Sequence, residues 1–204
     1  MTSLERMYAF CQAVRYVESA RIPGDIVECG VWRGGSMMLA ARTLIEVGNA
    51  DRHLWLYDTF EGMTEPTDRD VSFTGSSATE LWQVRKSWCE SPIDEVWTNM
   101  ASTGFPSDRL ELVKGKVEDT IPGRVPREIA VLRLDTDWYE STYHELRHLV
   151  PLMRAGSVLI VDDYGHWHGH REAIDKYLAE AKIPMLLQRT DHAGRMGILP
   201  RRHT

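Results

Sequence analysis

Short apolar runs alternate with longer amphipathic stretches along the whole chain. Seven runs have the length and composition of β-strands: 25–30, 53–58, 110–114, 129–135, 157–163, 184–188 and 195–199. Six stretches with apolar residues at helical spacing predict α-helices: 3–19, 35–47, 79–90, 92–102, 139–150 and 170–182. Regular alternation of strand and helix is typical of a doubly wound sheet. We therefore expect an α/β fold with a mainly parallel, seven-stranded, Rossmann-like sheet in a single domain over 1–204.

Two segments stand outside this alternation. An N-terminal helix, within 1–22, precedes the first strand and ends at the helix breaker Ile22-Pro23-Gly24. A polar stretch at 61–78, rich in Gly, Thr, Ser and Asp, is long for a connection, and such loops are often lids or binding loops. We expect a lid or insertion region at 61–103, with a mobile surface insertion as the alternative.

Composition narrows the class of protein. The formal net charge of −6 disfavours a nucleic-acid partner, which usually needs a basic face. No apolar run reaches the roughly 20 residues that cross a bilayer, and the first residues lack the order of a signal peptide. The 3 cysteines are scattered, which argues against a disulfide framework and a structural zinc site. We expect a cytoplasmic protein with neither a membrane nor a nucleic-acid partner.

Acidic residues stand at or near the ends of four predicted strands. They are Glu28, Asp58, Asp135 and the pair Asp162-Asp163. Any one of them alone would be interpreted as a helix N-cap or a surface acid. Ligands of parallel sheets bind outside the carboxyl ends of the strands, so the convergence of these acids on one edge predicts a ligand site.

The first of these strands runs into a turn with three glycines, over 28–36. The turn has neither the GxGxxG spacing of dinucleotide-binding proteins nor the GK[ST] of a P-loop. Glu28 suits a ligand ammonium, and the helix N-terminus after the turn suits a carboxylate, so one zwitterionic amino acid satisfies both. An acid at the position of Asp58 typically accepts hydrogen bonds from ribose hydroxyls. An aminoacyl end and a ribose end together indicate S-adenosyl-L-methionine.

Asp135, Asp162 and Asp163 form a second acidic group. Adjacent strand ends lie roughly 5 Å apart, and carboxylates at that distance repel one another unless a cation or protons intervene. A hard divalent cation such as Mg²⁺ takes oxygen ligands, so these three residues are candidate metal ligands. The alternative is that Asp163 caps the next turn and Asp162 forms a surface ion pair.

Four segments in this order resemble the macrocin O-methyltransferase family. They are VECGVWRGG at 27–35, YDTFEGM at 57–63, LRLDTDWYEST at 132–142 and VDDYG at 161–165. The resemblance covers nearly the whole chain. It implies a class I, metal-dependent methyltransferase that transfers the methyl group of S-adenosyl-L-methionine to a sugar hydroxyl, notably in macrolides and related natural products.

The resemblance also implies roles for individual residues. Asp135, Asp162 and Asp163 match the metal-binding acids, and Asp135 is the usual candidate for the base that takes the substrate proton. The turn after Glu28 would hold the methionine part of the cofactor, Asp58 the ribose, and the region of Val117 would border the adenine. The cofactor-binding residues expected on this basis are Glu28, Gly30, Arg33, Gly34, Ser36, Asp58, Thr59, Val117 and Glu118.

His166 is the second candidate base, because the pKa of histidine lies near working pH and the residue follows the Asp162-Asp163 pair. We expect His168 and His170 to lie in an exposed turn. Trp138 and Trp167 flank the same edge of the sheet, where aromatic rings could stack on a sugar.

The acceptor is expected to be a small molecule or an oligosaccharide. The first strand begins near residue 25, which leaves a shorter N-terminal cover than is common in the family and puts a macrolide acceptor in doubt. A catechol-type, Mg²⁺-dependent O-methyltransferase and a non-catalytic S-adenosylmethionine-binding protein are the alternatives. We also expect a homo-oligomer, most simply a dimer.

Overall fold

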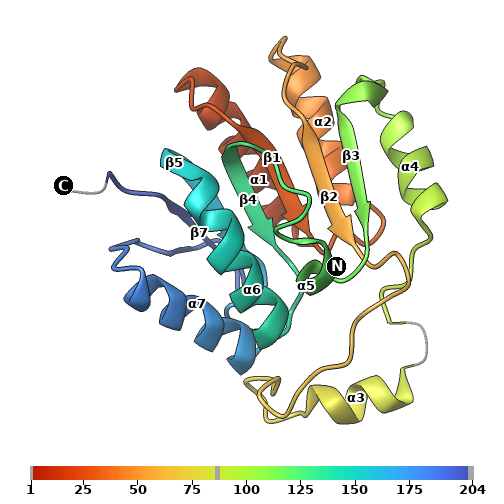
Figure 1. The fold of residues 1–204 in the computed structure, drawn as a ribbon, viewed down its shortest axis with the longest axis vertical. Helices are drawn as coiled ribbons and strands as arrows, with labels where there is room; N and C mark the ends of the chain where they lie inside the picture. The colour runs from red at the N-terminus through yellow and green to blue at the C-terminus, as the bar shows by residue number, and fades with distance from the viewer. Residues whose placement is uncertain (1, 86–87, 202–204) are drawn as a thin grey trace.

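A twisted seven-stranded sheet forms the centre of the computed structural model, which describes residues 2–85 and 88–201 (Figure 1). The strands are β1 Asp25–Cys29, β2 Leu54–Asp58, β3 Leu110–Lys114, β4 Ile129–Leu134, β5 Met153–Val161, β6 Gln188–Arg189 and β7 Arg195–Ile198. Their spatial order is β3-β2-β1-β4-β5-β7-β6, with β1 to β5 parallel and β7 antiparallel to both neighbours. The predicted doubly wound, mainly parallel sheet is confirmed, and its strand order reverses between β1 and β4.

Helices cover both faces of this sheet. In the described residues they are α1 Leu4–Ser19, α2 Gly35–Glu46, α3 Ala78–Val84, α4 Ile93–Ala101, α5 Val117–Thr120, α6 Tyr139–Leu149 and α7 His168–Glu180, with short 3₁₀ turns at Ser107–Arg109 and Val150–Leu152. Helices α1, α2 and α4 share one apolar core with one face of the sheet. Helices α6 and α7 share a second core with the other face. Strand β4 lies between the cores and is buried along its whole length, which explains its nearly continuous apolar run.

Two predicted elements differ from the observed ones. The strand expected at 184–188 pairs only from Gln188 onward, because Pro184 has no N–H to donate to a neighbouring strand. The helix expected at 79–90 is α3, which ends at Val84, and Arg85 continues with extended dihedral angles. Residues 86–87 of that prediction lie outside the described residues.

The polar connection that follows β2 packs against the starts of α6 and α7. The Trp138 indole N–H donates to the carbonyl of Thr64 (3.0 Å), and the His168 N–H donates to the carbonyl of Val71 (2.8 Å). A third apolar cluster joins the two parts, and it consists of Met63, Ala78, Leu81, Trp88, Trp138 and Trp167. In Figure 1, α3 therefore lies below the carboxyl ends of the strands.

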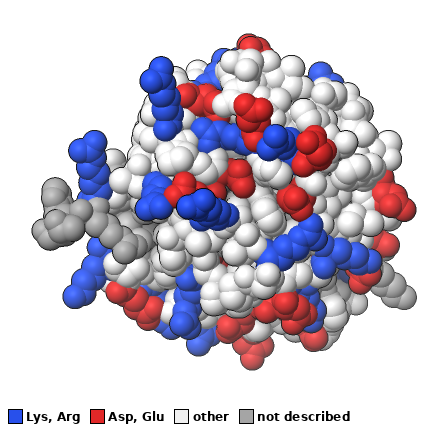
Figure 2. Space-filling model, turned by 45° about the horizontal axis from the view of Figure 1, so that its top comes forward, with Lys and Arg blue, Asp and Glu red and all other residues white. Residues whose placement is uncertain are grey.

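The surface carries both signs of charge. On the face that Figure 2 shows, Lys and Arg side chains lie beside Asp and Glu side chains. Ion pairs at the surface of the protein include Arg154–Glu128 and Arg124–Glu111. In the described part of the chain, no helix combines the length and the apolar character that spanning a membrane requires.

Replacing Asp70 should loosen the connection after β2. Its buried carboxylate accepts hydrogen bonds from the backbone N–H groups of Tyr139 (2.9 Å) and Thr67 (2.7 Å). Asp70→Ala leaves both donors without this partner, so we expect the free energy of unfolding to fall by about 1–3 kcal/mol. Urea denaturation measures the loss, and hydrogen exchange should rise across 61–78. The exposed Asp68 is the matched control, and equal effects of Asp68→Ala and Asp70→Ala would contradict the assignment.

Candidate active site

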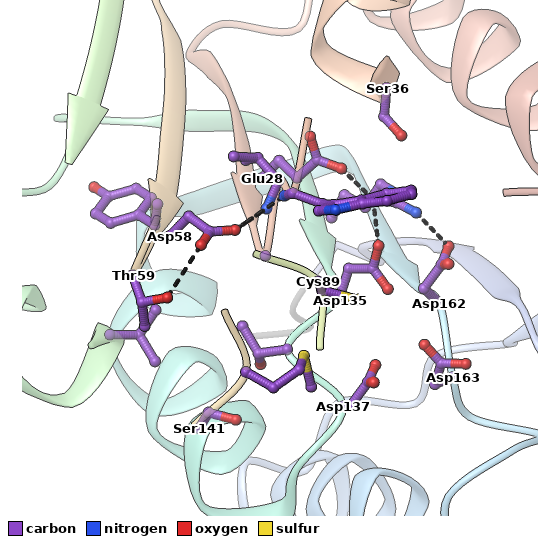
Figure 3. Close-up of a pocket in the computed structure, with 18 of the residues that line it drawn as sticks. Glu28, Ser36, Asp58, Thr59, Cys89, Asp135, Asp137, Ser141, Asp162 and Asp163 are labelled. Atoms are coloured by element: carbon purple, nitrogen blue, oxygen red, sulfur yellow. Dashed lines mark hydrogen bonds and ion pairs between the residues drawn. The ribbon is translucent and has the colours of Figure 1, made fainter. Parts of the chain in front are cut away.

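A cavity of about 630 Å³ opens at the carboxyl ends of β1, β2, β4 and β5. It lies where the strand order reverses, which is the usual place for a ligand in such a sheet. Figure 3 shows Glu28, Asp58, Asp135, Asp137 and Asp163 arranged around it. The cavity therefore collects acids from four separate strand ends and the segments that follow them.

The turn after β1 needs glycine for a steric reason. Gly30 has a φ of 81°, and a Cβ there would lie 2.2 Å from the carbonyl oxygen of Asp135. Asp58 holds the same turn, because its Oδ2 accepts hydrogen bonds from the backbone N–H groups of Val31 (2.9 Å) and Trp32 (2.9 Å). Burial raises the pKa of Asp58, and these backbone donors offset part of the rise. Asp58 is thus both a residue of the cavity wall and the anchor of the turn.

Glu28 lies at the inner end of the cavity and is fully buried. Its Oε1 forms an ion pair with Arg133, while its Oε2 has no hydrogen-bond partner among the described residues. Burial raises the pKa of Glu28 to about 7, against the opposing effect of the Arg133 charge. One oxygen of Glu28 is therefore paired with Arg133, and the Ser36 hydroxyl at the start of α2 is a further neighbour of the carboxylate.

Arg133 is the centre of a buried ion-pair network. Besides Glu28, its guanidinium pairs with Oδ2 of Asp135 (2.9 Å) and Oδ1 of Asp162 (2.8 Å). The network continues from Asp162 to Arg6 of α1, and from Arg6 to Asp191 (2.8 Å) in the β6–β7 turn. Sequence reasoning missed the role of Arg133, although a charged residue within an apolar strand almost always has a buried partner.

Asp135, Asp137 and Asp163 form the acidic cluster of the site. One carboxylate oxygen from each lies within 4.8 Å of the other two. Burial raises the pKa values of Asp135 and Asp137 well above the ordinary value for aspartate. Burial opposes ionisation of Asp163 as well, but hydrogen bonding from Asp137 and the charges of His170 and Arg6 lower its pKa. Such a group of close oxygen donors fits a hard divalent cation.

The cluster differs from the predicted metal ligands in one member. Both oxygens of Asp162 face arginines, Arg133 on one side and Arg6 on the other, and Asp137 joins Asp135 and Asp163 in its place. Sequence reasoning did not select Asp137, which follows the end of β4 and has a φ of 65°. A left-handed conformation in a residue other than glycine is costly and concentrates at functional sites.

The predicted cofactor-binding residues, with one exception, line the cavity: Glu28, Gly30, Arg33, Ser36, Asp58, Thr59, Val117 and Glu118. Gly34 is the exception, and it caps the N-terminus of α2 in a left-handed conformation. His166 also lines the cavity, with its ring centroid 4.7 Å from that of Trp167. Thr2, Arg6 and Met7 add a wall from the N-terminal segment that sequence reasoning did not identify.

His170 does not lie in an exposed turn, and that prediction is wrong. The residue is fully buried on α7, and its Nδ1 lies 2.9 Å from Oγ1 of Thr142. Burial lowers the pKa of His170 to about 4. The helix begins at His168, so His170 falls on the face that packs against α6, while His168 is exposed as expected.

Comparison with known proteins gives a consistent result. The family model of macrocin-O-methyltransferase (TylF) matches residues 1–196. The 8-demethyl-8-(2,3-dimethoxy-alpha-L-rhamnosyl)-tetracenomycin-C 4'-O-methyltransferase of Streptomyces olivaceus is 32% identical over 200 residues, which is 95% of this chain and 73% of that protein. The demethyldecarbamoylnovobiocin O-methyltransferase of Streptomyces niveus is 32% identical over 194 residues, with the same coverage of 95% and 73%.

Two solved structures of O-methyltransferases are also similar to this chain. The O-methyltransferase NovP superposes with a TM-score of 0.88 at 30% identity, over 98% of this chain and 81% of that one. An O-methyltransferase from Bacillus cereus, solved with S-adenosylhomocysteine (SAH), superposes with a TM-score of 0.62 at 14% identity, over 98% of this chain and 83% of that one. The second likeness concerns the fold alone.

Removing the central guanidinium should destabilise the fold. Arg133→Met leaves Glu28, Asp135 and Asp162 buried without their shared cation, and breaking a buried pair in this way costs about 3–5 kcal/mol. Arg154→Met is the matched control, because Arg154 is 64% exposed in its pair with Glu128 and such pairs contribute about 0–1 kcal/mol. Urea denaturation compares the two. Equal stability of both variants would mean that the buried acids do not depend on Arg133.

Proposed function

We propose an acceptor and a cation for the reaction of this chain, which belongs to the macrocin-O-methyltransferase family. The chain is an S-adenosylmethionine-dependent O-methyltransferase. The proposed acceptor is a hydroxyl group of a sugar, an oligosaccharide or a glycosylated natural product, and the proposed cation is Mg²⁺ or a similar divalent ion. The main support is that the glycine turn, Asp58 and the acidic cluster all face one cavity.

The donor would occupy the part of the cavity near β1 and β2. The unpartnered Oε2 of Glu28 suits the ammonium of the methionine moiety, and the N-terminus of α2 beside Ser36 suits its carboxylate. Asp58 accepts three backbone hydrogen bonds, and a carboxylate has lone pairs to accept another from a ribose hydroxyl. Val117 and Glu118 line the cavity beyond and would border the adenine.

Asp135 and Asp163 would hold the cation, because they belong both to the predicted ligand set and to the observed cluster. Asp162 is the predicted ligand that the geometry supports least, since each of its oxygens already faces an arginine. When bound, S-adenosyl-L-methionine supplies an electrophilic methyl group and the cation lowers the pKa of the acceptor hydroxyl. The protein itself contributes position and electrostatics.

Asp137 is the proposed proton acceptor. It stands within the cluster, and among the described residues it has no ion pair with an arginine or lysine, whereas Asp135 pairs with Arg133. In its ionised form, without the proton of its hydrogen bond to Asp163, Asp137 would take the proton from the acceptor hydroxyl as the oxygen–methyl bond forms and the sulfur–methyl bond of the donor breaks to release SAH. His166, which lines the cavity, is the second candidate.

The acceptor would bind in the outer part of the cavity. Trp88 and Trp167 contribute aromatic surface to the cavity lining, and Thr2, Met7 and His192 also belong to it. Aromatic faces beside hydrogen-bonding groups suit a sugar carried on an apolar scaffold. The names of the Streptomyces relatives, which include a rhamnosyl-tetracenomycin and a novobiocin precursor, are consistent with this acceptor class.

Titration calorimetry tests the donor site. Wild-type protein should bind SAH, and Asp58→Ala should weaken that binding by roughly 10- to 100-fold, because charge-assisted hydrogen bonds to the turn and the ribose are lost. Asp135→Asn should retain SAH binding and lose Mg²⁺ binding. Asp108→Ala is the control, because the Asp108 side chain is exposed and does not line the cavity. Failure of the wild-type protein to bind SAH would contradict the proposed function.

Methyl transfer to a panel of alkyl rhamnosides tests the proton acceptor. Asp137→Asn should lower kcat by about 10²- to 10⁴-fold, which is the usual contribution of a general base, while Mn²⁺ binding by the same variant persists. Asp163→Asn should lose Mn²⁺ binding together with turnover. A larger loss of kcat in His166→Asn than in Asp137→Asn would make His166 the base. Turnover of catechol in place of every sugar would point to a catechol-type enzyme.

A further inference from the structure

A buried acid behind the cavity wall has no part in the reaction described so far. Glu145 lies on α6, is fully buried, and does not line the cavity. Its Oε1 accepts a hydrogen bond from Oγ1 of Thr136 (3.0 Å), and the thiol of Cys29, at the end of β1, is a second hydrogen-bonding neighbour of the carboxyl group. A buried polar side chain of this kind is costly to keep unless it serves the structure or the reaction.

Thr136 occupies a sensitive position in the site. It stands between Asp135 and Asp137, which both contribute to the acidic cluster. The Asp135 N–H donates to the carbonyl of Cys29 (2.9 Å), which ties the start of this segment to β1, and the Trp138 N–H closes a local turn on the carbonyl of Thr136 (2.8 Å). The hydrogen bond to Glu145 adds a side-chain anchor in the middle of the segment, opposite the carboxylates of the cluster.

Glu145 is better suited to accept a hydrogen bond than to act through a negative charge. Burial raises the pKa of Glu145 well above the ordinary value for glutamate, and the hydrogen bonds from Thr136 and Cys29 offset only part of the rise. An uncharged carboxyl still accepts the Thr136 hydroxyl proton through its carbonyl oxygen. Burial favours this uncharged form, which would add no negative charge beside Glu28, Asp135 and Asp137.

The backbone gives such an anchor a purpose. Asp137 has a φ of 65°, a conformation that persists only when the surroundings enforce it. A one-residue shift or a rotation of the segment would turn Asp135 or Asp137 away from Asp163. Groups that orient metal ligands from behind typically change cation affinity by about 10- to 100-fold when removed.

We propose that Glu145 is a positioning residue for methyl transfer, which acts through the Thr136 hydroxyl to hold Asp135 and Asp137 in register with Asp163. The inference rests on the proposed function, in which Asp135 and Asp163 of this cluster hold a divalent cation and Asp137 accepts the proton.

Mn²⁺ binding, followed by electron paramagnetic resonance of free Mn²⁺, tests the inference without an acceptor. Thr136→Val and Glu145→Leu should each weaken Mn²⁺ binding by about 10-fold or more. Glu145→Gln keeps a carbonyl oxygen for the Thr136 hydroxyl and should bind Mn²⁺ nearly as wild-type protein does. Glu140→Leu, at an exposed glutamate of the same helix, is the matched control. SAH binding by calorimetry should stay close to wild type in all four variants.

Mn²⁺ affinities of Thr136→Val and Glu145→Leu equal to that of wild type would overturn the inference, even if both variants melted at lower temperature. A loss in Glu145→Gln as large as that in Glu145→Leu would overturn the uncharged hydrogen-bond role. If Glu145→Leu does not fold, Thr136→Val decides alone, since it removes only the hydroxyl. Wild-type protein that binds SAH but not Mn²⁺ would contradict the proposed cation, and wild-type protein that binds neither would contradict the proposed function itself.

Discussion

The shared guanidinium of Arg133 is the interaction on which the rest of the site depends. It is 3% exposed, and a charge so far from water is tolerable only with opposite charges around it. Glu28 of β1 is the residue directly beside Arg133 in the β1–β4 register, and Asp162 follows the neighbouring β5. The Arg133 side chain therefore joins the ends of three strands. It holds Glu28, Asp135 and Asp162 around a single positive charge.

This arrangement explains why the fold was easier to predict than the site. Hydrophobic periodicity depends on neighbouring residues, so it correctly indicated the doubly wound sheet and most of its elements. The glycine turn was also recognisable, because the requirement for Gly30 is local and steric. The strand-end rule found Asp135 and Asp163 but treated Asp162 as equivalent to Asp163. Which of two adjacent acids meets a distant arginine is a tertiary property that spacing along the chain does not contain.

The residues that sequence reasoning overlooked share this character. Asp137 joins the cluster through an unusual backbone conformation, and Arg6 reaches Asp162 from a helix at the other end of the sequence. His170 was misplaced because the start of α7 depends on the docking of the polar connection, through the His168 N–H to Val71. In the proposed function, residues at the strand ends bind the methyl donor and the cation. Helix α1 and the connection after β2 line the space for the acceptor.

The contact between Arg6 and Asp191 spans 185 residues of sequence. Contacts of such separation close large loops, and the entropy of that closure opposes the contact until both ends of the chain are in place. The pocket wall made by α1 and the β6–β7 turn thus requires both ends of the sequence to be in place. A partly folded chain could bury its apolar cores and still leave Asp162 without one of its two cations. Ligand binding would then report that this wall is complete, and a bound donor would in turn favour the fully assembled chain by mass action.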